Sequence, residues 1–176
     1  MIYNLFKFPV LIVNIDTSKI ILKNDKFEKT WLSKTKSSFN SNNNLSEDSK
    51  EYLLKIIANN LFQIINKPFK LELQQIWENI YEKGDFQEKH THPGSHFSFI
   101  IYKKIKNPHT IFFNPIHNLL MSYYNENDHI QDLFKIHEKI EIREQQMIIF
   151  PSFLEHMVEK TDDSVTVSGN TTLKML

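Results

Sequence analysis

Apolar positions recur at two different periods along this chain, and the change of period marks a change of predicted secondary structure. From Asp48 onward, apolar side chains recur every three or four positions, which predicts an amphipathic helix. The apolar positions of this pattern are Leu53, Leu54, Ile57, Leu61, Ile64 and Ile65. Glu51 follows Asp48 by three residues, as in a capping box, and Pro68 ends the pattern. We expect this helix to pack its apolar face against a sheet.

Beyond Pro68 the period shortens towards two, which is typical of β-strands. One face of the first predicted strand would carry Leu71, Leu73, Gln75, Trp77, Asn79 and Tyr81. Further strands are predicted at residues 96–102 (HFSFIIY), 110–114 (TIFFN), 139–150 (KIEIREQQMIIF) and 164–170 (SVTVSGN). An early strand is expected within residues 6–15, where Pro9 favours an edge or a strand start. The order of elements predicts a mainly β protein with N-terminal helices covering one face of an all-β core, an α+β arrangement.

Composition narrows the function classes. The 176 residues with 40% hydrophobic content are enough for one sizeable core. The 21 basic and 21 acidic side chains balance, and the one short basic run is at residues 103–106, so the sequence has no clear signal of a nucleic-acid partner. No apolar run approaches the roughly 20 residues that span a bilayer, and no signal-peptide pattern is found at the start, so we expect a cytoplasmic protein without a membrane partner. The absence of cysteine excludes disulfides, thiolate metal sites and cysteine nucleophiles.

Histidines supply the candidate chemistry. His90 and His92 lie two residues apart, so their side chains point to the same face of an extended segment. Imidazole is a common ligand of divalent iron, and His156, just after an apolar strand, could complete a set of three ligands. His96 is a rival ligand, because it lies four residues beyond His92. The residues alone leave open that all of these are ordinary surface or hydrogen-bonded histidines.

Two short segments resemble the motifs of the cupins. GDFQEKHTH places a glycine six residues before His90, and PSFLEH places a proline five residues before His156. Cupins usually carry a glutamate beyond the histidine pair, where this chain has His96 and Phe97. They also carry a glycine two residues after the proline, where this chain has Phe153.

A resemblance to another family covers roughly the C-terminal half. WENIYEKGDFQEKHTHPGSHFSFIIY and MIIFPSFLEHMVEKTDDSVTVSGN together resemble the Fe(II)- and 2-oxoglutarate-dependent oxygenases of bacteria and phages, relatives of the prolyl hydroxylases. The matching positions, in order, are Trp77, Asn79, Gly84, His90, His92, Pro93, Ser95, Ser98, Tyr102, Phe150, Pro151, Ser152, His156, Val158, Ser168 and Asn170. A weaker similarity surrounds Trp31 and Ser33.

The resemblance implies a double-stranded β-helix, a jelly-roll or cupin-like fold. It implies one domain over residues 1–176, with helical support over about 1–70 and a metal-site barrel over about 71–176. Fe(II) would be bound by His90, His92 and His156, with 2-oxoglutarate and O₂ as co-substrates. Most of the wider superfamily has an aspartate as the second ligand, which lowers the net charge of the site. Three neutral imidazoles would leave the site with the full positive charge of the ion, and this favours an anionic co-substrate.

The family's arginine, which grips the distal carboxylate of 2-oxoglutarate, is replaced by Ser164. We expect hydroxyl groups of Thr166 and Tyr102 to donate to this carboxylate, with Ser164 beside them. We also expect Lys104 to supply charge, because strand alternation places it on the face of Tyr102. Asn79 is expected to point into the barrel, where it needs a partner.

The resemblance implies a dioxygenase that hydroxylates a small molecule, a peptide or a protein. A cupin-type metalloenzyme that does not use 2-oxoglutarate is one alternative. A degenerate, non-catalytic β-helix module is the other, and the missing arginine favours it. Substrate contacts are expected within residues 114–138, and His109, His117, His129 and His137 are expected at the surface.

Overall fold

The computed structural model describes residues 8–29, 32, 35–107, 110–116, 118–119, 122 and 135–176. The large sheet has the strand order β1, β11, β8, β13, β6, β4, β3, with antiparallel neighbours throughout. Its strands are β1 (Leu11–Asn14), β11 (Gln146–Pro151), β8 (Phe97–Lys104), β13 (Ser164–Met175), β6 (Phe69–Tyr81), β4 (Lys36–Ser37) and β3 (Glu28–Lys29). The second sheet is formed by β10 (His137–Lys139), β9 (Thr110–Phe113), β12 (His156–Thr161) and β7 (Asp85–His90). A small pair joins β2 (Leu22–Asn24) to β5 (Asn43–Leu45), and a 3-10 turn, η1, covers Thr17–Lys19.

The predicted helix is present as α1 (Glu47–Ile65). Its N-cap is Ser46, whose Oγ accepts the Ser49 N–H at 3.3 Å. The N-cap predicted at Asp48 is therefore wrong, because the helix begins two residues earlier. The helix ends at Asn66, which has φ 50° in the left-handed region, two residues before Pro68. The part of α1 that faces the sheet is fully buried and consists of Leu53, Ile57 and Leu61.

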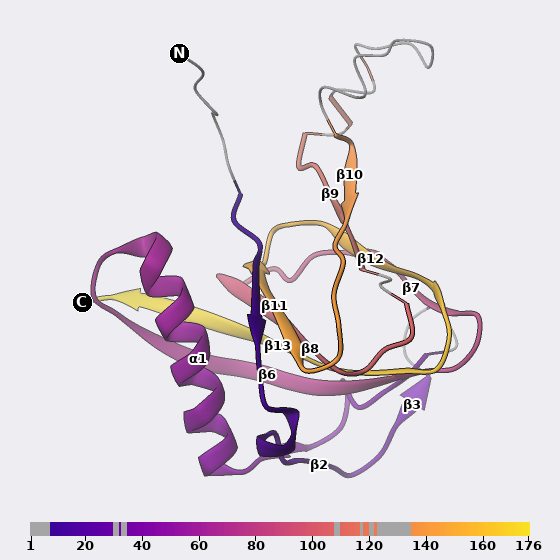
Figure 1. Ribbon diagram of the computed structural model, residues 1–176, viewed down its shortest axis with the longest axis horizontal. Coiled ribbons are helices and arrows are strands. Elements are labelled where there is room, and N and C mark those ends of the chain that lie inside the picture. The colour runs from indigo at the N-terminus through magenta and orange to yellow at the C-terminus, as the bar shows by residue number, and fades with distance from the viewer. Residues whose placement is uncertain are drawn as a thin grey trace.

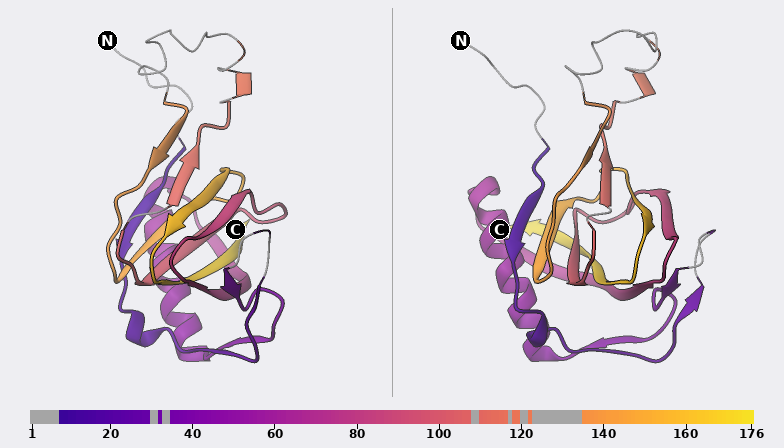
Figure 2. Two further views of the ribbon diagram at one scale, coloured as in Figure 1. Left: turned by 90° about the vertical axis from the view of Figure 1, so that its right-hand side faces the viewer. Right: turned by 45° about the vertical axis from the view of Figure 1, so that its right-hand side comes forward.

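The large sheet lies between α1 and the second sheet, as Figures 1 and 2 show. On the α1 side, strand residues join the helix in one apolar cluster, the helix-side core, which includes Ile76, Phe99, Ile101, Met147, Ile149 and Val167. On the opposite side, a second cluster fills the space between the two sheets and includes Ile100, Tyr102, Phe112, Ile148, Phe150 and Leu154. Alternation along β8 and β11 therefore divides their side chains between two cores.

A β-bulge in β6 changes which residues share a face. The pairing with β13 shifts between Asn170 and Thr171, opposite Gln75 and Leu73, which inserts one extra residue into β6. As a result, Leu71 and Leu73 pack into the helix-side core, whereas Trp77, Asn79 and Tyr81 lie on the other face. The single face predicted for all of these residues is therefore wrong.

Several further expectations need correction. The stretch 139–150, predicted as one strand, is not continuous: Lys139 ends β10, and β11 begins only at Gln146. Gln145, with φ 61°, interrupts the extended backbone just before β11. Two polar strands, β7 and β12, and the short β10 were not predicted. Among the described residues before Pro68, α1 is the only α-helix, and β1, β3 and β4 join the large sheet, so this part is not purely helical. A search of the described residues finds no helix with the length and apolarity needed to cross a membrane.

Candidate metal centre

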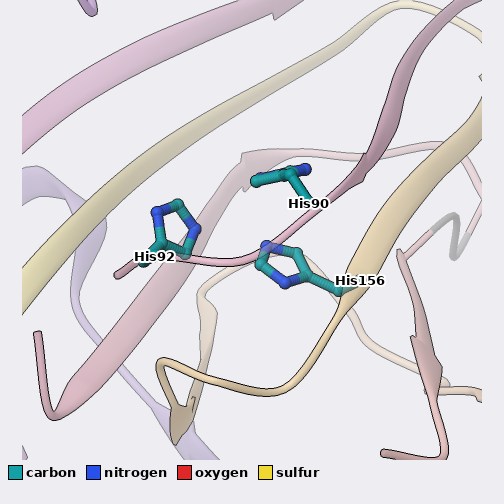
Figure 3. A group of neighbouring side chains, drawn as sticks. All are labelled: His90, His92 and His156. Carbon is teal, nitrogen blue, oxygen red and sulfur yellow. The ribbon is translucent and has the colours of Figure 1, made fainter. Parts of the chain in front are cut away.

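Three histidines from two neighbouring strands meet between the two sheets. His90 ends β7, His92 lies two residues beyond it, and His156 begins β12. Because β7 and β12 are antiparallel neighbours, His156 lies directly opposite His90. One possible ligand nitrogen of each ring lies within 4.8 Å of those of the other two. Figure 3 shows the three rings turned towards one another.

The orientation of two of these rings is fixed by the backbone. His90 Nδ1 lies 2.7 Å from the Glu88 carbonyl oxygen, and His156 Nδ1 lies 3.0 Å from the Leu154 carbonyl oxygen. A carbonyl oxygen only accepts hydrogen bonds, so each Nδ1 carries the proton and each Nε2 keeps its lone pair. The Gln87 amide nitrogen, 3.4 Å from His90 Nε2, is consistent with this tautomer, because it donates to a lone pair. Metal-binding histidines are usually held in this way.

Burial keeps the three imidazoles neutral. Burial, together with the neighbouring His90, lowers the pKa of His92 to about 4. Burial also lowers the pKa of His90, and it lowers the pKa of His156 well below the usual value. Neutral imidazole is the form that binds a metal, so no proton has to be displaced near neutral pH.

The segment that carries His92 is held by hydrogen bonds to the end of β11 and to β13. The His92 N–H donates to the Ser152 carbonyl at 2.9 Å, and the Ser152 N–H donates to the His96 carbonyl at 3.0 Å. The His96 side chain is exposed, and its Nδ1 accepts the Leu173 N–H at 3.0 Å. His96 therefore lies outside the group formed by the other three histidines, and the described residues give no support to it as the rival ligand.

Beside the histidines lies a group of buried hydroxyls, here called the hydroxyl pocket: Tyr81, Tyr102, Thr110 and Thr166. The hydroxyls of Tyr102 and Thr110 are 2.6 Å apart, and Tyr81 is hydrogen-bonded to Thr166. The Tyr81 hydroxyl also donates to Gln87 Oε1 at 3.1 Å, which connects the hydroxyl pocket to the amide beside His90. Burial raises the pKa of both tyrosines, so they stay protonated and can donate hydrogen bonds.

Two other residues expected at the co-substrate site are buried but make internal hydrogen bonds. The Ser164 hydroxyl donates to the Asp162 carbonyl oxygen at 2.9 Å. Asn79 accepts from the Ser37 hydroxyl at 2.7 Å, and its amide nitrogen lies 3.4 Å from the Ser168 hydroxyl. The buried Asn79 side chain is therefore hydrogen-bonded, as expected for a buried polar group. Its two partners lie on β4 and β13, so these hydrogen bonds link the two strands.

Lys104 does not point inward as expected. Tyr102 pairs with Thr166 and Lys104 pairs with Val165, so Lys103 is an extra residue in β8 at a bulge. The bulge reverses the alternation, and the Lys104 side chain is exposed. Lys103 forms an ion pair with Glu78, with its Nζ 2.9 Å from Glu78 Oε1.

Sequence reasoning missed four residues of the cavity around the histidines. Tyr81 and Trp77 were given no role at the site, and Gln87 and Thr110 were not singled out. The polar strand β7 has no apolar alternation that would have placed Gln87 in the interior. Some expectations lie outside the described residues: His109, His117, His129, Trp31, Ser33 and residues 123–134. His137, on β10, is exposed as expected.

Fold and site together define a β protein with three neutral imidazoles between two sheets, of which His156 is buried and His90 and His92 are partly buried. A family model described as 2OG-Fe(II) oxygenase matches residues 75–168, more than half of the chain. The chain belongs to this family, whose enzymes use Fe(II), 2-oxoglutarate and O₂. No curated protein sequence matches the chain.

Solved structures agree with this fold. HygX from Streptomyces hygroscopicus, with nickel, 2-oxoglutarate and hygromycin B bound, has a TM-score of 0.54 and 10% identity, over 93% of this chain and 82% of that one. An oxidoreductase of the 2OG-Fe(II) oxygenase family from Burkholderia pseudomallei has a TM-score of 0.50 and 8% identity, over 93% of this chain and 68% of that one. At these identities the likeness concerns the fold alone.

Proposed function

We propose that this chain is an Fe(II)- and 2-oxoglutarate-dependent dioxygenase that hydroxylates a small molecule, a peptide or a protein. We further propose that it acts in the cytoplasm and forms one domain, a double-stranded β-helix made of the two facing sheets. His90, His92 and His156 would hold the iron. The observation that carries this proposal is the group of three neutral imidazoles, two of which have the proton fixed on Nδ1.

The donor set suits the ion. Imidazole is a good ligand for Fe(II), and three protein ligands leave coordination positions for the co-substrate and O₂. When bound there, the iron supplies the oxidative decarboxylation of 2-oxoglutarate by O₂ that is coupled to hydroxylation. The protein's own contribution is to hold the rings, to keep them neutral and to exclude water from the space between the sheets. His156 is only 2% exposed, in keeping with such a dry site.

The hydroxyl pocket would bind the distal carboxylate of 2-oxoglutarate. Tyr102 and Thr166 are the expected donors, and their buried hydroxyls are joined there by Tyr81 and Thr110. Neutral hydroxyls bind a carboxylate less strongly than the bidentate arginine usual in the family. We therefore propose that this chain holds 2-oxoglutarate with several hydroxyls in place of that arginine, whose position in the sequence is taken by Ser164.

The test is an anaerobic titration with Fe(II) and then 2-oxoglutarate, followed by visible absorption. We expect the wild type to bind iron and to develop the weak band of an Fe(II) chelate of a 2-oxo acid. His156→Ala should abolish both, whereas His96→Ala is the matched control from the same group of histidines and should keep both. Iron binding without the band would favour the cupin-type alternative, and no iron binding would favour the non-catalytic module; either result contradicts the proposal.

A further inference from the structure

The indole nitrogen of Trp77 is a buried hydrogen-bond donor that has no partner among the residues that the structure describes. The Trp77 side chain is 2% exposed, and its Nε1 finds no acceptor within the described part of the chain. An indole N–H can donate but cannot accept, so any partner must be an acceptor such as an oxygen. Buried donors without an acceptor are rare in folded proteins, and each one calls for an explanation.

Trp77 also lies at the site. Its ring is 5.7 Å from the His92 ring, between centroids, and lines the same cavity as His90 and His156. On another side, the Phe39 ring packs edge-on against it at 5.0 Å. Contacts with both rings fix the indole in place, so it is poorly able to turn towards another acceptor.

We propose that Trp77 is a co-substrate-binding residue whose Nε1–H donates to a carboxylate oxygen of the 2-oxo acid beside His92. This inference rests on the proposed function and adds a residue to it. Trp77 pairs with Ser168, which lies two residues along β13 from Thr166 of the hydroxyl pocket. This separation is about 7 Å at the usual rise of a strand, within reach of the five-carbon chain of 2-oxoglutarate. A distal carboxylate held in the hydroxyl pocket by Tyr81 and its neighbours leaves the carboxylate next to the keto group as the acceptor for Trp77.

The hydrogen bond can be observed directly. The chain has two tryptophans, so Trp31→Phe leaves Trp77 as the only source of an indole resonance. In the ¹⁵N-labelled variant with Zn(II), a diamagnetic ion that imidazole also binds, we expect the indole proton signal to move downfield on addition of 2-oxoglutarate. Its exchange with solvent should slow at the same time. An indole signal that does not change on addition of 2-oxoglutarate would overturn the inference.

To measure how much the Trp77 hydrogen bond contributes to 2-oxoglutarate affinity, a substitution must remove only the indole N–H group. In the Trp31→Phe background, benzothienylalanine in place of tryptophan puts sulfur where the N–H stood and keeps the ring shape. We expect the Kd for 2-oxoglutarate, measured by calorimetry with Zn(II) present, to rise about 10-fold, in line with a hydrogen bond to a charged group. Zn(II) binding should stay unchanged, and Trp77→Phe should show the same loss.

The outcomes separate the two proposals. If Trp31→Phe with natural tryptophan binds Zn(II) and 2-oxoglutarate, and the analogue binds both equally well, the inference about Trp77 is wrong and the proposed function stands. If that reference protein binds neither ligand, the proposed function fails and the inference fails with it.

Discussion

The two faces of the large sheet hold very different side chains, although the same strands build both. Towards α1, alternate residues such as Ile76 and Val167 join an apolar cluster with the helix. Towards the second sheet, their neighbours Trp77 and Thr166 surround the three histidines, together with other buried polar groups. Residues facing α1 thus contribute to stability, whereas part of the opposite face surrounds the histidines beside a second apolar cluster. Substitutions at the helix-side core and at the site should therefore separate the effects on stability from those on ligand binding.

The largest loss of stability is expected on the helix side. Ile57 is 0% exposed, so Ile57→Ala should lower the free energy of unfolding by about 2–5 kcal/mol through lost burial and a residual cavity. Urea denaturation measures this loss. Ile64 on the same helix is 42% exposed, so Ile64→Ala is the control and should change stability by about 0.5 kcal/mol or less. Equal effects of the two substitutions would show that α1 is not docked through Ile57.

A smaller loss of stability is expected at Gly169, where the backbone of β13 packs closely against the Phe99 ring. A Cβ added at Gly169 would lie 2.3 Å from Phe99 Cζ and 2.7 Å from the Gln75 carbonyl oxygen. Gly169→Ala should therefore cost about 1–3 kcal/mol in unfolding free energy, as overpacked cores do. Combining it with Phe99→Leu should give a loss smaller than the two separate losses added together. Strict additivity would mean that the close contact does not carry the effect.

On the opposite face, the expected effect moves from stability to ligand affinity. Thr166→Val keeps the shape of a buried side chain and removes one hydroxyl of the hydroxyl pocket, so 2-oxoglutarate affinity should fall about 2- to 10-fold. Thr172→Val on the same strand is the control, because Thr172 is not part of that pocket. Calorimetry with Zn(II) present gives both values. An unchanged affinity in Thr166→Val would place the distal carboxylate elsewhere.

The smallest effects are expected at the two lysines of the β8 bulge. Lys103→Ala removes a partly exposed ion pair with Glu78 and should cost at most about 1 kcal/mol by urea denaturation. Lys104→Ala should leave the affinity for 2-oxoglutarate unchanged, because the Lys104 side chain is exposed. A clear loss of affinity in Lys104→Ala would restore the inward role that strand alternation alone suggested.

The pattern of apolar residues predicted those helices and strands that have one clearly apolar face. The helix and the strands later found as β6, β8, β9, β11 and β13 have apolar residues in short runs or at helical or alternating spacing, and these residues pack into a core. Strands β7 and β12 were missed because charged residues occupy their outward positions and few apolar residues mark the inward ones. The bulges in β6 and β8 were also missed, since an extra residue in a strand depends on pairing with a distant partner.

For the candidate site, the sequence likewise predicted some residues and missed others. The spacing of His90 and His92 placed them on one face, and the structure brings His156 beside them. Residues that depend on the register between strands, such as Gln87 and Thr110, gave no sequence signal. The hydrogen bonds that fix the two Nδ1 protons involve backbone carbonyls, so no side-chain pattern could have indicated them.

The most direct test of the central claim is the number of Fe(II) ions bound per chain under anaerobic conditions. We predict one Fe(II) for the wild type and close to none for His90→Ala, His92→Ala and His156→Ala, each of which should remain folded by circular dichroism. His96→Ala and His137→Ala should still bind one, because both side chains are exposed and lie outside the group of three. Full iron binding by any of the first three variants would contradict the assignment of that histidine as a ligand.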